Sequence, residues 1–553
     1  MAFEGLTSMT EKTTTVQDAV FEVFRAFGID RVFGNPGSTE LSFLQRFPSD
    51  LDYVLGLQEA VVVGMADAYA AASGRPAVVN LHTATGVGNG MGAMANARDN
   101  KTPMLVIAGQ QHREMLVAEP LLANPDAVTL TRPIAKWSHE STRAGDIPID
   151  VARALRAALT PPCGPVFLST PMDDLGRELS ADDLYRLRAT LARECRSTPV
   201  VADDSLATIA ERMDAADQVA LVFGGEIDRD DAHSAAVALA DSTGAPVWSA
   251  PVEGRLCFPN NHPQYQGELE PAIGLIAHVF AEFDLVVVVG APVFKYYPYV
   301  PGPWLANGTD LIQLTSAPNE AVDAVVGSAW VGHVGSALEG LLKKVQHHRT
   351  PPEPLPEPVS VSDVDPPLPE AVFDALAASA PANTVWVNES PSNVGQFWQR
   401  VRPSEPHSFY FSAGGGLGYG MAAAVGAGMA QPHRPVIAVI GDGSAQYALP
   451  AMWTAQRYSI PVVFVVLRND EYAILKWFAQ FENADSVPGL DVGGIETTTI
   501  ASGYGLATAS VRTRDEIIAA VTEALERRGP TLIEVPVTTV TPLLGGDVSH
   551  VDR

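Results

Sequence analysis

Apolar runs long enough for one buried strand alternate along the chain with segments of helical length. The runs lie at 76–81, 104–108, 165–169, 219–223, 284–290, 310–314, 436–440 and 461–467. Strands that alternate with helices favour parallel sheets, because parallel neighbours need a crossover connection. The pattern therefore predicts an α/β protein with three doubly wound parallel-sheet domains, over 14–190, 200–345 and 370–540. The proline-rich, acidic segment 349–369 is predicted to be a semi-extended linker.

Two polar clusters follow two neighbouring strands of the last predicted domain. Gly441-Asp442-Gly443-Ser444 follows the first strand, Asn469 follows the second, and a helix is expected between them from Gln446 to Tyr458. Parallel strands end at one edge of the sheet, where open α/β sheets bind ligands. Asp442 and Asn469 offer oxygen ligands suited to Mg²⁺, and the glycines let backbone amides approach a phosphate. The first cluster alone would also suit an ordinary capped turn, but the pair indicates a diphosphate held through a metal.

The first predicted domain carries a second group of candidates. Phe33-Gly34-Asn35-Pro36-Gly37-Ser38 is typical of a turn at a strand end. Glu59 follows an expected strand at Tyr53–Gln58 and begins an apolar helix. His82 ends another strand and enters an expected glycine-rich turn over Thr85–Gly90. Each residue taken singly has a structural interpretation, as a turn residue, a helix N-terminal acid or a strand-end histidine.

Composition narrows the functional classes. The 553 residues carry 36 basic and 64 acidic side chains, a net charge of −28, which makes nucleic acid and anionic membrane surfaces poor partners. Three widely spaced cysteines form no metal motif and fit a reducing cytoplasm. No apolar run is long enough to cross a membrane, and the N-terminus lacks a signal-peptide pattern. A nicotinamide dehydrogenase is disfavoured, because no Gly-x-Gly-x-x-Gly opens a helix after the first strand.

Longer phrases connect these candidates to a known family. They are VFGNPGS at 32–38, LQEA around Glu59, NLHTATGVGN around His82, AGQQ at 108–111, GAPVF at 290–294, VIAVIGDGSA at 436–445 and VPGLDV at 487–492. With these phrases the chain resembles the thiamine-diphosphate-dependent 2-oxo acid decarboxylases from about Val16 to Pro542. Within that family it is most similar to the benzoylformate decarboxylases.

The resemblance implies thiamine diphosphate and Mg²⁺ as cofactors and roles for particular residues. The three domains would be the pyrimidine-binding, central and diphosphate-binding domains of the family. Glu59 would bond the pyrimidine ring of the cofactor, Ser38 would bind the substrate carboxylate and His82 would relay protons. Asp442, Asn469 and the backbone carbonyl of Glu471 would bind the metal. The implied cofactor-binding residues are Asn35, Pro36, Gly37, Glu59, Ser392, Gly415, Leu417, Gly441, Gly443, Ser444, Tyr472, Ala473 and Ile474.

The resemblance also indicates the substrate pocket, where this chain departs from the family. The candidate pocket walls, which could equally be ordinary core residues, are Leu121, Leu122, Phe411, Leu475, Trp477 and Phe478. Tyr297 stands where the benzoylformate decarboxylases have a second active-site histidine, and Ile474 where the family has an alanine. Tyrosine, with a reference pKa of about 10, is a poor proton shuttle near neutral pH. We therefore expect Tyr297 to slow protonation and to favour ligation to a second aldehyde.

The resemblance implies non-oxidative decarboxylation of an aromatic or bulky 2-oxo acid to an aldehyde and CO₂. Two alternatives stay open: a carboligase or synthase with the same cofactor, and a catalytically silent homologue. The presence of Glu59, Ser38, His82, Asp442 and Asn469 disfavours the silent homologue. In this family Glu59 and the diphosphate motif serve one cofactor from different chains, so a homodimer is the expected minimum and a homotetramer the expected assembly.

Overall fold

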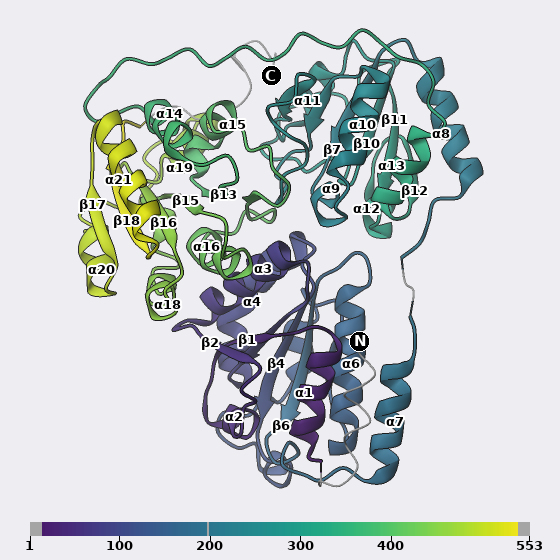
Figure 1. Ribbon diagram of the computed structural model, residues 1–553, viewed down its shortest axis with the longest axis vertical. Helices are drawn as coiled ribbons and strands as arrows, with labels where there is room; N and C mark the ends of the chain where they lie inside the picture. Colours follow the sequence, from purple (N-terminus) through teal and green to yellow (C-terminus); the bar gives the residue numbers. More distant parts are fainter. Residues whose placement is uncertain (1–13, 196–197, 540–553) are drawn as a thin grey trace. The chain divides into compact units, whose positions relative to one another are not determined.

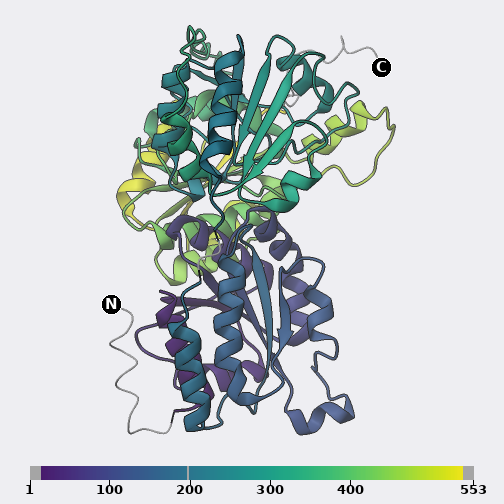
Figure 2. The same cartoon turned by 90° about the vertical axis from the view of Figure 1, so that its right-hand side faces the viewer.

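The computed structural model describes residues 14–195 and 198–539, which form two compact units. One unit contains 14–195 together with Met421–Gln431 and Ala448–Tyr458, and the other contains the remaining described residues. The first unit is built on one parallel six-stranded sheet and the second unit on two (Figure 1 and Figure 2). The predicted α/β fold with three parallel sheets is confirmed.

The first sheet has the strand order β2-β1-β3-β4-β6-β5. Its strands are β1 (Arg31–Asn35), β2 (Asp52–Leu55), β3 (Ala77–Leu81), β4 (Met104–Gln110), β5 (Ser138–Glu140) and β6 (Pro165–Pro171). Its helices are α1 (Val16–Ala26), α2 (Leu41–Leu44), α3 (Glu59–Ser73), α4 (Thr83–Asp99), α5 (Ala127–Thr131), α6 (Ile147–Leu159) and α7 (Ala181–Ala192). Val32 packs into a core with α1 and α6, while the next residue, Phe33, meets Tyr69 of α3 on the other face. The alternation of strand side chains thus explains why helices cover both faces.

The central sheet has the order β12-β11-β10-β7-β8-β9. β7 and β10 pair in parallel, and the strand order runs outward from them in opposite directions, which makes this pair the topological switch point of the sheet. Its strands are β7 (Val219–Phe223), β8 (Val247–Ser249), β9 (Tyr265–Glu268), β10 (Leu285–Val289), β11 (Asp310–Thr315) and β12 (Ser328–Val331). Its helices are α8 (Asp203–Ala215), α9 (Glu226–Arg229), α10 (His233–Thr243), α11 (Ile273–Val279), α12 (Pro318–Asp323) and α13 (Val334–Leu342).

The third sheet has the order β14-β13-β15-β16-β18-β17. Its strands are β13 (Val385–Glu389), β14 (Phe409–Tyr410), β15 (Val436–Gly441), β16 (Val462–Arg468), β17 (Ala507–Ser510) and β18 (Thr531–Pro536). Its helices are α14 (Pro369–Ser379), α15 (Val394–Arg400), α16 (Tyr419–Ala430), α17 (Asp442–Ala445), α18 (Ala451–Arg457), α19 (Ala473–Phe481), α20 (Thr497–Gly503) and α21 (Arg514–Arg527). Counted from its own first strand, the order is 2-1-3-4-6-5, the same as in the first sheet.

Two local expectations are wrong. The helix expected over 446–458 covers only Ala451–Arg457, as α18, and Pro450 occupies the position directly before it. The strand expected over 53–58 ends at Leu55, since Gly56 makes the last backbone bond to β1 and the chain then turns into α3, which Gln58 caps. Residues 349–368 form no helix or strand, and Arg349 at their start is anchored by bonds from its guanidinium to the carbonyls of Met213, Ala216 and Asp217.

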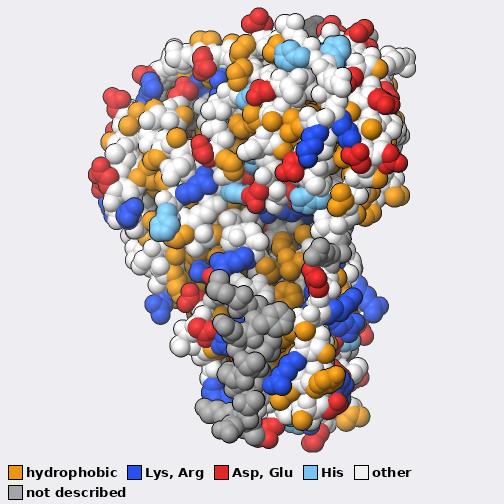
Figure 3. All heavy atoms as spheres, turned by 45° about the vertical axis from the view of Figure 1, so that its right-hand side comes forward, with side chains coloured by type: hydrophobic (Ala, Val, Ile, Leu, Met, Phe, Trp, Pro, Cys, Tyr) orange, Lys and Arg blue, Asp and Glu red, His pale blue; other side chains and the backbone are white. Residues whose placement is uncertain are grey.

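Acidic and basic side chains are both distributed over the surface. On the face drawn in Figure 3, acidic side chains are interspersed with basic and apolar ones rather than gathered in one patch. Over the described parts of the chain, no helix combines the length and the apolar character needed to cross a membrane.

Candidate active site

The two polar clusters of the third sheet meet at its carboxyl edge. β15 and β16 pair in parallel with Gly441 opposite Leu467, so both strands end side by side. Oδ2 of Asp442 accepts the backbone N–H groups of Asn469 at 3.2 Å and Asp470 at 2.7 Å, and Oδ1 accepts that of Gly443 at 2.8 Å. The side chain of Asp442 therefore joins the two clusters directly.

The oxygens at this edge suit a magnesium ion. Burial raises the pKa of Asp442 above its usual value, and a bound cation would remove the cost of ionising that carboxyl. Asn469 Oδ1 lies 3.3 Å from the backbone N–H of Glu471. The carboxylate of Glu471 instead pairs with Lys476 and accepts a hydrogen bond from Thr539. The backbone carbonyl oxygen of Glu471 is therefore the atom of this residue that is left as a metal ligand. A carboxylate, an amide oxygen and a carbonyl fit the hard-ligand preference of Mg²⁺.

The turn after β15 is shaped for close approach. A Cβ atom on Gly443 would lie 2.5 Å from the ring of Tyr472, so only glycine fits there. Ser444 is buried in the same turn, within α17. Tyr472 directly precedes α19, whose first residues are Ala473 and Ile474. This edge thus gathers most of the residues implied for the diphosphate.

Two more predicted segments lie at the carboxyl end of β13. Ser392 belongs to a 3₁₀ turn at Pro391–Asn393, shortly after the strand. Gly415 and Leu417 precede α16, and Gly415 has a φ of +71°, which favours glycine. Phe411 lies nearby in sequence and donates its backbone N–H to the carbonyl of Gly254.

The first sheet brings together the other candidates. Glu59 begins α3 and its carboxylate accepts from Asn35 Nδ2 and from Asn89 Nδ2, both at 3.2 Å. Pro36 and Gly37 continue the turn after β1, and Ser38, which is exposed, begins a short 3₁₀ turn. Glu59 is therefore paired with two amide donors, as a half-buried carboxylate requires.

The expectation of a glycine-rich turn after His82 is wrong. Residues Thr83–Asp99 form α4, which packs closely on α3. A Cβ atom on Gly90 would lie 3.3 Å from Val63 of α3, and one on Gly86 would lie 3.5 Å from Oε1 of Glu59. Gly90 therefore serves the close approach of α4 to α3, and the segment is helical rather than a turn.

Glu40 is a site residue that sequence reasoning missed. It is 1% exposed, and its Oε2 lies 2.8 Å from Nδ1 of His82. The same carboxylate accepts the backbone N–H groups of Gly37 at 2.9 Å and Gly109 at 2.8 Å. A Cβ atom on Gly37 would lie 2.2 Å from the ring of His82, so glycine is required for this arrangement. The available signal was the acid placed three residues after a turn, the pattern of a capping box.

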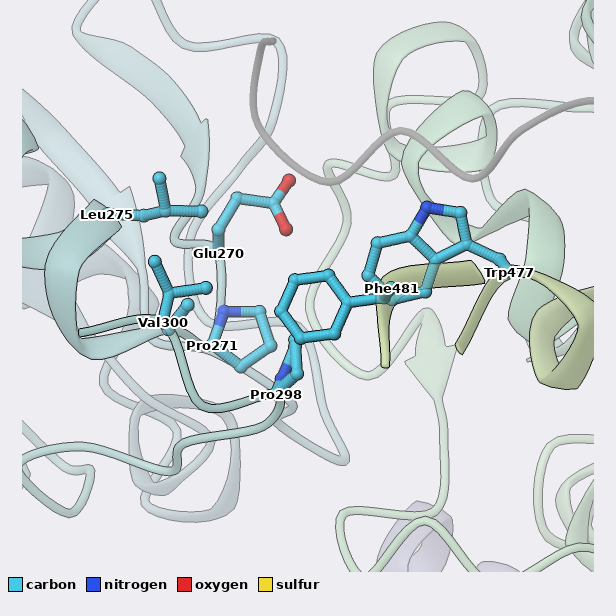
Figure 4. A pocket seen from close by; sticks show the side chains of 8 residues that line it. Glu270, Pro271, Leu275, Pro298, Val300, Trp477 and Phe481 are labelled. Carbon is cyan, nitrogen blue, oxygen red and sulfur yellow. The ribbon is translucent and has the colours of Figure 1, made fainter. Parts of the chain in front are cut away.

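Tyr297 and α19 form an aromatic row. The rings of Tyr297 and Phe478 have centroids 4.8 Å apart, and Trp477 meets Phe478 at 4.8 Å and Phe481 at 5.3 Å. Tyr297 is 65% exposed. Figure 4 shows Trp477 and Phe481 turned toward Pro298, where they line a small apolar pocket with Pro271 and Val300. One side of α19 therefore packs against loops of the central sheet.

Three of the predicted pocket walls do not belong to the hydrophobic core. Leu121 is 85% exposed, and Leu122 and Leu475 are also exposed. Phe411 is partly buried against the core of the third sheet. For the three leucines, the alternative of ordinary core packing is thereby excluded.

Family models match all three parts of the chain. The N-terminal TPP binding domain, the central domain and the C-terminal TPP binding domain of thiamine pyrophosphate enzymes match residues 14–130, 206–341 and 392–535. The chain belongs to the thiamine pyrophosphate enzymes, as its motifs predicted.

Individual relatives narrow the comparison. The chain is 45% identical over 530 residues to benzoylformate decarboxylase of Pseudomonas aeruginosa, a match that covers 96% of this chain and 100% of the relative. A solved thiamine-diphosphate-dependent 4-hydroxybenzoylformate decarboxylase of Rhodococcus jostii RHA1 superposes with a TM-score of 0.93 at 41% identity, covering 95% of this chain and 100% of that one. Benzoylformate decarboxylase from Polynucleobacter necessarius gives a TM-score of 0.92 at 38% identity, with 96% and 99% covered.

Proposed function

We propose that the protein is a thiamine-diphosphate- and Mg²⁺-dependent decarboxylase that converts benzoylformate, or an aryl 2-oxo acid of similar size, to an aldehyde and CO₂. The observation that carries this proposal is the similarity over nearly the whole chain to benzoylformate decarboxylase of Pseudomonas aeruginosa. The convergence of Asp442 and Asn469 at one sheet edge supports it, because a diphosphate cofactor needs a metal site there.

The third sheet would hold the cofactor. Asp442, Asn469 and the carbonyl of Glu471 would bind Mg²⁺, and the turn at Gly441–Ser444 would receive the diphosphate. Ser392, Gly415, Leu417, and Tyr472 to Ile474 would line the rest of the cofactor site. Bound thiamine diphosphate supplies the nucleophilic carbon and the electron sink that a 2-oxo acid needs in order to lose CO₂.

The first sheet would supply the proton chemistry. Glu59, oriented by Asn35 and Asn89, would exchange a proton with the pyrimidine ring of the cofactor. Ser38, exposed on its turn, would donate to the substrate carboxylate. His82 would transfer protons through Nε2, because its Nδ1 faces Glu40. Each of these groups acts by holding or moving a proton at a defined atom.

The active site is proposed to lie between subunits. Leu121 and Leu122 are apolar side chains that stand exposed on a single chain, and a second copy would cover them. In this arrangement Glu59 of one chain and the diphosphate motif of another serve one cofactor, so a homodimer is the minimum unit and a homotetramer is the proposed assembly. We place the protein in the cytoplasm, since its three cysteines, all of them in the described residues, form no disulfide.

Carboligation is the second candidate function, and Tyr297 is the observation that favours it. The Tyr297 hydroxyl makes no hydrogen bond to any described residue, and its ring packs on Phe478. A side chain held in this way fills space rather than relaying protons. Protonation after the loss of CO₂ would then be slow, and a second aldehyde would have time to react first.

The test is aldehyde release by purified protein reconstituted with thiamine diphosphate and Mg²⁺. Benzoylformate, 4-hydroxybenzoylformate and pyruvate are the substrates, and protein stripped of both cofactors is the control. We expect cofactor-dependent benzaldehyde and little acetaldehyde. Added benzaldehyde tests for ligation. Release of acetaldehyde at a higher kcat/KM than benzaldehyde would contradict the aryl assignment, and acyloin in excess of free aldehyde would favour the carboligase.

A further inference from the structure

Glu389, the last residue of β13, gathers three backbone N–H groups of one segment. Gly418 and Tyr419 donate to its Oε1 at 2.7 and 3.0 Å, and Gly420 donates to its Oε2 at 3.0 Å. The residue is 3% exposed. Within 14–195 and 198–539, no basic side chain forms an ion pair with this carboxylate. Its charge is therefore stabilised by amides of the main chain alone.

These amides belong to the start of α16. The first N–H groups of a helix have no partner within the helix, and a carboxylate placed there satisfies them and interacts well with the helix dipole. Gly420 allows the contact, because a Cβ atom on it would lie 2.8 Å from Cβ of Glu389. Gly418, the first residue of the bonded segment, has a φ of +95°, so the chain turns at this residue. The carboxylate thus ties the C-terminal end of the Ala413–Gly418 loop to β13.

The backbone of Glu389 lies beside the other half of the proposed cofactor site. β13 pairs with β15 in a register that sets Glu389 opposite Ile440, directly before Gly441 and Asp442. A Cβ atom on Gly441 would lie 3.9 Å from the Glu389 carbonyl oxygen. One residue therefore holds one cofactor segment with its side chain and borders the second with its main chain.

We propose that Glu389 is a positioning residue for thiamine diphosphate. Its carboxylate holds Gly418–Gly420 and thereby keeps Gly415 and Leu417 in the conformation that binds the cofactor. The inference rests on the proposed function, because it takes Gly415 and Leu417 to contact the cofactor. Burial raises the pKa of Glu389 to about 7, and the three backbone N–H groups oppose that rise because they stabilise the ionised carboxylate.

The experiment compares wild type, Glu389→Gln and Glu389→Ala as full-length proteins. The matched control is Glu226→Gln, since Glu226 is equally buried and caps the backbone N–H of Ser316 at 2.8 Å in the central-sheet region, away from the loop. Thiamine diphosphate affinity is measured at saturating Mg²⁺ by tryptophan fluorescence quenching, at a temperature where each variant is folded. The melting temperature without cofactor and kcat at saturating cofactor are measured in parallel.

We expect the Kd for thiamine diphosphate to rise about tenfold or more in Glu389→Ala. Glu389→Gln should raise it about threefold, because one carbonyl oxygen remains for Gly418 and Tyr419. The control Glu226→Gln should leave the Kd unchanged even where it lowers the melting temperature. kcat at saturating cofactor should stay close to wild type in the control Glu226→Gln.

Unchanged Kd in folded Glu389→Ala would overturn the inference and leave Glu389 a purely structural cap. If the alanine variant does not fold, the glutamine variant decides in the same way. A rise of Kd in the control equal to that in Glu389→Gln would also overturn it. Failure of the wild type to bind thiamine diphosphate would instead reject the proposed function, and this inference with it.

Discussion

Oε2 of Glu40 lies 2.8 Å from Nδ1 of His82, and the contact is buried on the glutamate side. The N–H groups of Gly37 and Gly109 fix the carboxylate, and Thr39 Oγ1 lies 3.1 Å from the same ring nitrogen. A carboxylate in this place holds a proton on Nδ1 and orients the ring. Nε2, which bonds no described residue, is therefore the nitrogen left for proton transfer.

Glu40→Gln should lower kcat with benzoylformate by about 10- to 100-fold, because the amide no longer holds the proton on Nδ1. Cofactor affinity should stay within about twofold, since Glu40 does not belong to the diphosphate edge. Steady-state kinetics check this, with Glu22→Gln, a partly exposed glutamate on α1, as the control. An unchanged kcat would show that Glu40 only caps the turn at Gly37.

Glu59→Gln should keep the fold and cofactor binding but nearly abolish turnover, because an amide cannot exchange a proton with the pyrimidine ring. Circular dichroism, thiamine diphosphate affinity and aldehyde release measure the three properties. Turnover near that of the wild type would remove Glu59 from the catalytic group.

Asp442→Ala should lose Mg²⁺-dependent retention of the cofactor, because the carboxylate would be the only charged metal ligand. Gel filtration in dilute Mg²⁺ followed by thiamine diphosphate quantification measures this. Asp470→Ala, which removes an adjacent exposed acid, is the control. Equal retention by Asp442→Ala and wild type would reject the metal site.

Tyr297→Phe should retain kcat/KM for benzoylformate within about threefold, whereas Tyr297→Ala should lower it about tenfold. The reason is that the ring, packed on Phe478, supplies the contact while the hydroxyl has no partner in the described chain. Kinetics with benzoylformate and pyruvate separate the two variants. A large loss in Tyr297→Phe would show instead that the Tyr297 hydroxyl takes part in the reaction.

The stability of the second unit should depend on pH through His407. Its Nδ1 lies 3.1 Å from Asp228 and its Nε2 lies 2.7 Å from Asp231, while Arg255 and His233 also face Asp228. The hydrogen bond to Asp228 raises the pKa of His407 above 6.5. Burial alone would raise the pKa of Asp228, but His407 and Arg255 outweigh it and lower the pKa to about 2.

For His407 the raised pKa gives stability that is fully present below about pH 6.5 and is lost as the pH rises through the folded-state value. For Asp228 the lowered pKa gives stability that is lost only as the pH falls toward 2. His407→Gln should therefore destabilise the protein more at pH 6 than at pH 9, by on the order of 1 kcal/mol. Urea denaturation at both pH values measures the difference, and equal destabilisation would contradict the assignment.

The sequence was sufficient for the sheets because their strands are buried runs that admit little besides parallel packing. The run Val219–Phe223 is one such strand, and each residue in it is buried. Local motifs were equally informative where chemistry and turn coincide, as at Gly441–Ser444. The motif reading failed where glycines permit close helix packing, since Thr85–Gly90 carries the composition of a turn but lies in α4.

Residues that act through contacts distant in sequence could not be found in this way. Glu40 reaches His82 and Gly109, and Glu389 reaches Gly418, only because strands far apart in the chain end at the same edge. Neither glutamate stands in a phrase that marks chemistry. Their roles depend on where the strands end, which a pattern of apolar positions does not specify residue by residue.

The first and third sheets share one strand order, so each loop of one sheet has a loop at the equivalent position in the other. His82 follows the third strand of one sheet, and Asp442 follows the third strand of the other. The proposed proton carrier and the proposed metal ligand thus occupy equivalent positions in two domains of the same chain that share one strand order. Because proton transfer and metal binding are assigned to different domains, a mutation can alter one of them without changing the fold that supports the other.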